Sequence, residues 1–361
     1  MLNKIYIKHI YNVYIERLVY ITLIFASLIF IMNILEEFKF FSDNNEIGIG
    51  IPIFLTILNL PSILFEIFPF IILITTQFFF IKFQSNSELL IFKNNGINNF
   101  KIIAILSLLV FFIGIFIITI FHFVSSNMKN NYLEFKNKYT KDNKYLAVIN
   151  ENGLWIKDKI DQTTMIIHSE RIDKNVLKNV VVTQYNDEYG DNINIIGDQA
   201  IINSNIWEIK NAISIESDGK RNKFESLSLE TNFDYLKINS LFSNLESLNL
   251  LELFNQQKDF DSVGLNSAEI ILYINKIVSL PVSLVIFSIL SSVLMFNFNF
   301  KNSKSFALII GILLSVIIYY IYYFFGLLGN NNKIPILFAV WLPNLIIFLT
   351  CTIGVVKINE K

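Results

Sequence analysis

Six long apolar runs constrain this chain more than any other feature of its sequence. They are Tyr11–Leu35, Ile51–Phe83, Phe100–Val124, Ile270–Phe296, Phe306–Leu328 and Ile334–Val356. A helix of about 20 apolar residues is long enough to cross a bilayer, and every run reaches that length. With 53% hydrophobic and 16% charged residues, the chain also has the composition of a membrane protein. We therefore predict an α-helical membrane protein with six transmembrane helices in a three-plus-three arrangement.

The first two apolar runs need a separate interpretation. The first is too long for a signal-peptide core and lacks a small-residue cleavage site, so we predict a retained helix. The second contains Pro52, Pro61 and Pro69, which predict a kink or an interfacial start. Its one carboxylate is Glu66. For this residue we expect an interfacial or cavity-facing position, and a role in transport is the alternative.

Basic residues in the short loops predict the orientation of the chain, because Lys and Arg concentrate on the cytoplasmic side. With the N-terminus inside, the inner segments hold Lys4, Lys8, Arg17, Lys82, Lys93, Lys101, Lys301, Lys304, Lys357 and Lys361. The short outer loops then hold only Lys39 and Lys333. We predict that both termini are cytoplasmic and that the large polar block lies outside.

This central block has the pattern of a β domain. From Tyr145 to Thr231, short β-type runs alternate with turn residues such as Asn152-Gly153, Tyr189-Gly190-Asp191 and Asp218-Gly219. Such spacing is typical of an antiparallel sandwich or roll, and we expect a jellyroll-like domain. Ser240–Lys258 has the pattern of an amphipathic helix that returns to the membrane. The predicted domains are 1–126 (helices one to three), 127–266 (extracytoplasmic β domain) and 267–361 (helices four to six).

A polar segment between the second and third spans predicts a short surface helix at about 85–96. Ser85 and Glu88 have the spacing of a capping box, so we expect the helix to begin near Ser85. Gly96 can end it in a left-handed conformation about three turns later. Leu89, Leu90 and Phe92 would form one apolar patch. A helix that merely rests on the membrane surface is the alternative.

The motifs of several function classes are missing. The sequence contains no Walker A, HExxH, GxSxG or GxGxxG pattern, so we predict neither a catalytic site nor a bound cofactor, and no enzyme. One cysteine, Cys351, and three scattered histidines predict no metal site. A net charge of -1 gives no basis for binding nucleic acid.

Several motifs, in order along essentially the whole chain, resemble one family. They are LPSILFEIFPF (60–70), SELLIFKNNGI (87–97), GLWIKD (153–158), IWEIKNA (206–212), INKIVSLPVSLV (274–285) and AVWLPNLI (339–346). Together with the expected topology they resemble the LptF/LptG permeases of the lipopolysaccharide export ABC transporter. GLWIKD and the C-terminal motif make the chain more similar to LptG than to LptF.

The resemblance implies a role and partners. A permease of this family extracts lipopolysaccharide from the bacterial inner membrane as a heterodimer with an LptF-like paralogue. An LptB-like ATPase dimer powers it, and LptC-like and LptA-like β-jellyroll proteins receive the lipid. By this resemblance, the ATPase contacts the coupling helix at Ser85, Ser87, Glu88, Leu89, Leu90 and Gly96, where a carboxylate can pair with a basic side chain. Spans one and five would form the lateral gate and substrate surface, with Asn33, Glu36, Lys39, Tyr319 and Tyr322.

One departure and one alternative remain. Family members tend to place several basic residues at the outer end of span one, where this chain has Asn33, Glu36, Glu37 and a single cation, Lys39. The alternative function is a membrane-anchored signalling or mechanotransmission protein with a partner-docking β domain. The two differ at the inner face of the β domain. A lipid path predicts an open apolar groove, near Ile209 or Leu227, whereas a docking module predicts a filled core.

Overall fold

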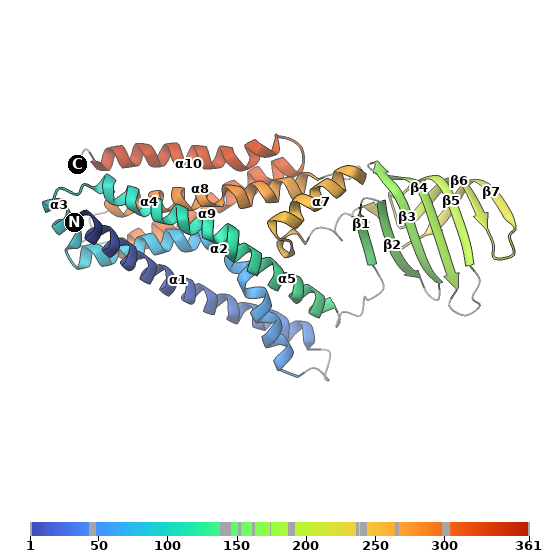
Figure 1. Cartoon of the computed structure of the whole chain (residues 1–361), viewed down its shortest axis with the longest axis horizontal. Helices are drawn as coiled ribbons and strands as arrows, with labels where there is room; N and C mark the ends of the chain where they lie inside the picture. The colour runs from blue at the N-terminus through green and yellow to red at the C-terminus, as the bar shows by residue number, and fades with distance from the viewer. Residues whose placement is uncertain are drawn as a thin grey trace. The chain divides into compact units, whose positions relative to one another are not determined.

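The computed structural model describes residues 2–42, 48–137, 146–150, 153–160, 163–173, 175–186, 192–235, 238, 244–263, 267–297 and 304–359. The chain divides into two compact units. The first, Met1–Tyr132 with Ile271–Lys361, is a helical bundle, and the second, Leu133–Ile270, holds the strands (Figure 1).

Eleven helical elements precede and follow the sheet within the described ranges, and one of them is a short 3-10 helix, Leu245–Ser247. In the first half they are α1 (Leu2–Phe41), α2 (Gly50–Ser85), α3 (Glu88–Asn94), α4 (Asn99–Phe116), a π-helical turn (Ile117–Phe121) and α5 (His122–Asn137). After the sheet come α7 (Leu250–Val263), α8 (Ala268–Asn297), α9 (Lys304–Asn330) and α10 (Ile336–Asn359). Six helices are long and apolar enough to cross a membrane, namely Ile5–Phe41, Gly50–Ser85, Asn99–Lys136, Ala268–Phe296, Phe306–Asn330 and Ile336–Ile358. The predicted six spans are confirmed.

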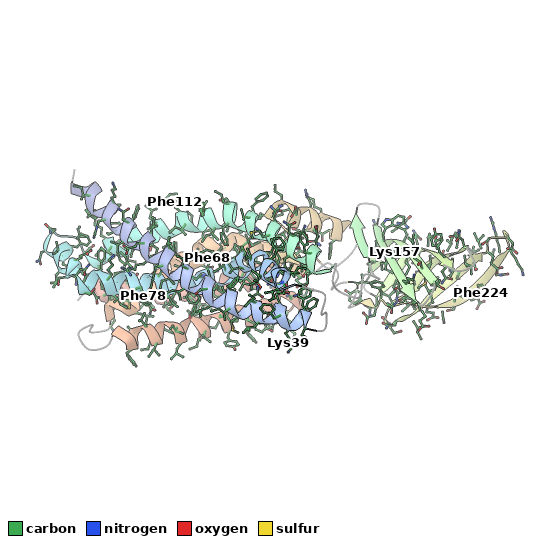
Figure 2. The ribbon with its side chains drawn as sticks, turned by 90° about the horizontal axis from the view of Figure 1, so that it is seen from below. Lys39, Phe68, Phe78, Phe112, Lys157 and Phe224 are labelled. Atoms are coloured by element: carbon green, nitrogen blue, oxygen red, sulfur yellow. The ribbon has the colours of Figure 1, made fainter. Side chains whose placement is uncertain are left out.

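Small side chains let the helices of the bundle approach closely. A Cβ atom on Gly114 of α4 would lie 2.7 Å from the Cα of Pro281 on α8, so only glycine fits there. Further along α8, the Ser291 hydroxyl donates to the Leu73 carbonyl of α2 at 2.9 Å. Phe68 lies inside the bundle and Phe112 on its surface (Figure 2). Glu66 of α2 is exposed, and its predicted interfacial or cavity-facing position stays a prediction.

The second unit contains one antiparallel sheet of seven strands, in the order β1 to β7. They are β1 (Leu146–Asn150), β2 (Gly153–Ile160), β3 (Thr163–Asp173), β4 (Val176–Asn186), β5 (Asn192–Ile201), β6 (Ile206–Ile215) and β7 (Arg221–Glu230). The expected antiparallel β domain is confirmed, and its described strands follow one another as a meander. Gly153 and Gly219 adopt the left-handed φ values of 117° and 83° that their predicted turns require. The predicted turn at 189–191 lies outside the described residues.

Two left-handed asparagines interrupt the pairing of the sheet. Asn179 in β4 has a φ of 53°, and its amide donates to the Glu170 carboxylate of β3 at 2.7 Å. Asn211 in β6 has a φ of 52°, and its amide donates to the Asp198 carboxylate of β5 at 2.9 Å. The alternation of apolar residues did not reveal these breaks, because a polar residue at an exposed position looks the same in either conformation.

The inner face of the sheet is filled. Ile156, Val182, Trp207 and Ile209 are at most 1% exposed. The indole Nε1 of Trp207 donates to the Phe233 carbonyl at 2.7 Å. Part of the cover comes from the segment after β7, which includes α7. The sequence predicted a returning helix over 240–258, whereas α7 spans Leu250–Val263, and residues 240–243 lie outside the described ranges. The open groove expected near Ile209 is therefore closed in this structure.

Candidate functional site

The turn between α2 and α3 differs from the predicted capping box. Ser85 is the last residue of α2, and its hydroxyl donates to the Lys82 carbonyl at 2.9 Å. Ser87 stands at the N-cap of α3 with a φ of 59° and makes no side-chain cap hydrogen bond. The prediction was wrong because α2 continues past the fully buried Phe83, so Ser85 serves the end of one helix and not the start of the next.

The predicted role of Gly96 is confirmed. Gly96 has a φ of 77°, its N–H donates to the Lys93 carbonyl at 3.0 Å, and the Ile97 N–H donates to the Phe92 carbonyl at 2.9 Å. This pair of bonds is the Schellman motif that ends helices at glycine. With seven residues, α3 has about two turns and is shorter than the three turns expected.

The inner side of α3 is held against α1 and α2. The Glu88 carboxylate accepts from His9 Nε2 at 2.8 Å and from the Asn86 amide at 3.0 Å. One turn later, the Phe92 ring lies 5.4 Å from the ring of Phe83 and 6.1 Å from that of Tyr6. We call Tyr6, His9, Glu88 and Phe92 the α1–α3 clamp.

The outer side of α3 presents different residues from those predicted. Leu90 and Ile91 are 60% and 55% exposed, Leu89 is half-buried, and Phe92 turns inward to the clamp. The expected patch of Leu89, Leu90 and Phe92 is therefore wrong, because residues two apart on a helix lie on different faces. The sequence contained part of the signal: Glu88 and Phe92 are four apart and share one face, whereas Leu90, two residues from each, lies on another.

The far end of α1 carries a buried polar cluster. Asn33 is 4% exposed, and its side-chain oxygen accepts from the Asn59 amide of α2 at 3.3 Å. Asn59 in turn accepts from Lys129 Nζ of α5 at 2.8 Å. One turn beyond Asn33, the Glu37 carboxylate is 1% exposed and accepts from the Tyr132 hydroxyl of α5 at 2.8 Å. This cluster ties the far end of α1 to α2 and α5.

The structure separates the residues predicted at this end. Asn33 points into the bundle, whereas Glu36 and Lys39 are exposed, and Lys39 lies at the edge of the bundle (Figure 2). Sequence reasoning noted Glu37 only as an acidic departure and missed Asn59, Lys129 and Tyr132. The spacing of four between Asn33 and Glu37 was the available signal for a shared face.

The two tyrosines predicted on the fifth span are also separated. Tyr319 of α9 is 66% exposed. Tyr322 turns inward, and its hydroxyl donates to the Asn344 side-chain oxygen of α10 at 2.7 Å, where the Ser283 hydroxyl of α8 also donates at 2.9 Å. Tyr322 therefore packs the bundle and Tyr319 belongs to its surface.

The first and fifth spans expose more apolar surface than the other four. In the most apolar 18-residue stretch of each helix, 11% of the residues are buried in α1 and 17% in α9. The corresponding share in the other four helices is 33% to 61%. Apolar surface of this extent needs lipid or another protein against it. Among the described residues, no group of His, Cys, Asp and Glu side chains could hold a metal ion.

Six helices that are long and apolar enough to span a membrane, with a separate antiparallel β domain, define a multi-pass membrane protein. The family model described as lipopolysaccharide export system permease LptF/LptG matches residues 8–356. The chain belongs to that family, whose model covers both the LptF and the LptG branch. None of the curated proteins compared with the chain matches it.

Proposed function

We propose that this chain is one permease subunit of an ABC transporter that extracts lipopolysaccharide from the inner membrane. It works beside an LptF-like or LptG-like paralogue and delivers the lipid through its β domain toward LptC-like and LptA-like proteins. An LptB-like ATPase dimer in the cytoplasm supplies the energy. Both termini are cytoplasmic and the β domain is periplasmic.

The observation that carries the proposal is the construction of α3. The clamp holds the helix rigidly from behind, while Leu90 and Ile91 face outward with no cover among the described residues. Such a helix suits a partner groove, in which exposed apolar side chains are buried and Glu88 pairs with a basic residue. The sequence contains no Walker A pattern, and we propose a separate protein as the motor.

Physical chemistry explains why a permease needs the exposed faces of α1 and α9. Each CH₂ group of an acyl chain costs roughly 0.8 kcal/mol to expose to water, so the lipid must stay shielded along its whole path. We propose that α1 and α9 form the lateral gates. The surface of the gates would carry Tyr319, Glu36 and Lys39. The inward-facing Asn33 and Tyr322 would hold the gate helices against the bundle.

A gentle-detergent affinity purification of the native chain tests this function. We expect a second six-span protein and a soluble ATPase to co-purify, and ATP hydrolysis by the complex to increase lipid release. An ABC transporter of known composition, purified from the same cells, is the control for detergent damage. Recovery of the chain without an ATPase, under conditions that keep the control intact, would overturn the proposal.

The filled inner face of the sheet favours a second candidate, a β domain that docks a partner and conducts no lipid. A photo-crosslinking residue at Leu227, which is half-buried on the inner face, separates the two. The matched control is Ser228, the next residue of β7, which is exposed on the opposite face. For a lipid path we expect lipopolysaccharide adducts at position 227 during ATP hydrolysis and none at 228. Equal or absent labelling at both positions would support the docking module.

A further inference from the structure

The α1–α3 clamp joins α3 to α1 through two contacts of different kinds. The hydrogen bond from His9 to Glu88 is 2.8 Å long, and the rings of Tyr6 and Phe92 meet edge to face at 6.1 Å. Tyr6 and His9 are three residues apart and Glu88 and Phe92 are four apart, so each pair lies on one face of its helix. Two contacts one turn apart fix the position and the angle of α3 against α1.

α1 is built to carry a displacement over its whole length. It is one helix of 40 residues, about 60 Å long, and contains neither proline nor glycine. By contrast, α2 contains Pro61 and Pro69. Residues 22–32 of α1 are exposed or half-buried, so this stretch can move without disrupting a protein core.

A buried contact close to the clamp can act as the pivot of this helix. Tyr14 is fully buried, and its hydroxyl lies 3.1 Å from the Thr76 hydroxyl of α2. At 1.5 Å per residue, His9 lies about 8 Å and Tyr6 about 12 Å on one side of Tyr14, while Asn33 lies about 28 Å on the other. A tilt about Tyr14 would therefore move Asn33 roughly two to four times as far as the clamp.

We propose that Tyr6 and His9 are coupling residues: they receive the movement of α3, and α1 transmits it as a lever to the polar cluster at Asn33 and Glu37. The proposal rests on the proposed function, in which the ATPase moves α3. Tilting α1 would change the Asn33–Asn59 and Glu37–Tyr132 contacts, which hold the far end of α1 closed against α2 and α5. Tyr6 and His9 act through α3 and α1 and touch neither nucleotide nor lipid.

The test is the double variant Tyr6→Ala/His9→Ala in the purified complex with its ATPase. We expect the ATPase to remain bound and its hydrolysis rate to stay within about twofold of native, while ATP-dependent lipid release falls at least about tenfold. The matched control is Lys8→Ala, an exposed residue on the same turn, for which we expect native release. The conservative double variant Tyr6→Phe/His9→Gln keeps a ring and a donor, so it should restore most of the release.

A second measurement follows the lever itself. Spin labels at Leu35 on α1 and Phe123 on α5, both exposed, report the distance at the far end, and the single cysteine, Cys351, is buried. We expect a nucleotide-dependent distance change in the native complex and none in Tyr6→Ala/His9→Ala. Native release and a native distance change in this variant would overturn the lever. If this variant lost ATPase binding together with lipid release, the lever would also be overturned. The clamp would then be needed for assembly of the complex and not for transmitting movement. Absence of the ATPase from the native complex would instead remove the proposed function, and the lever with it.

Discussion

Replacing Glu88 by lysine is expected to release the ATPase from the purified complex and to leave the paralogous permease bound. The Glu88 side chain is only 20% exposed and lies 2.8 Å from His9, so its carboxylate is held in one place. A lysine there would bring a positive charge toward His9 and toward the basic partner side chain that we propose. Removing one partner of such a pair costs about 2 kcal/mol or more, a weakening of at least about 30-fold. Co-purification at graded salt measures the effect.

Two variants separate the charge of Glu88 from its packing. Glu88→Gln keeps an acceptor for His9 and removes only the charge, so we expect weakened ATPase binding with the clamp intact. Asn94→Lys places a lysine at the exposed end of α3 instead, and we expect native binding. If Glu88→Lys co-purified with native amounts of ATPase, the proposed role of Glu88 would be contradicted. The ATPase would then bind the permease at a site other than α3.

Replacing Trp207 by alanine is expected to cost the β domain about 3–5 kcal/mol of its free energy of unfolding. Trp207 is fully buried in β6, and its indole N–H donates to the Phe233 carbonyl at 2.7 Å. The variant would leave a large cavity and a buried carbonyl without its donor, and both effects destabilise. Hydrogen exchange of strands β2 to β7 in the full-length chain measures the loss, and we expect lipid release to fall with it.

The sheet supplies its own control for this prediction. Trp155 in β2 has the same side chain but is 41% exposed, and its ring lies 4.2 Å from that of His168 in a tilted arrangement. Trp155→Ala removes a surface contact without a cavity, so we expect a cost below about 1 kcal/mol. Similar hydrogen exchange in the two variants would contradict the filled inner face, and with it the closed state of the β domain.

Local features of this chain were predictable from its residues. The six spans follow from hydropathy and length, because a lipid bilayer imposes the same requirement on every helix that crosses it. The strands follow from alternation and turn residues. The end of α3 at Gly96 follows from backbone sterics, because glycine adopts the left-handed conformation at little cost. Each of these depends on a few neighbouring residues and on the solvent.

The faces of the helices were decided by tertiary structure. Ser85 could begin one helix or end another, and the packing of Phe83 extended α2 through it. Asn33 and Glu36 looked equivalent at the end of the first span, yet only Asn33 faces Asn59. Tyr319 and Tyr322 also face different ways, because only Tyr322 donates a hydrogen bond to Asn344 of α10.

The sequence by itself therefore determined which segments are helices and strands, where several of them end, and the family to which the chain is similar. Only the tertiary structure decided that α3 is clamped to α1 by Tyr6 and His9, two residues about 80 positions before Glu88 along the chain. The physical reason is that a lone helix gains almost nothing from turning one face inward. The choice of face comes from burial and hydrogen bonds against partners that are distant in sequence.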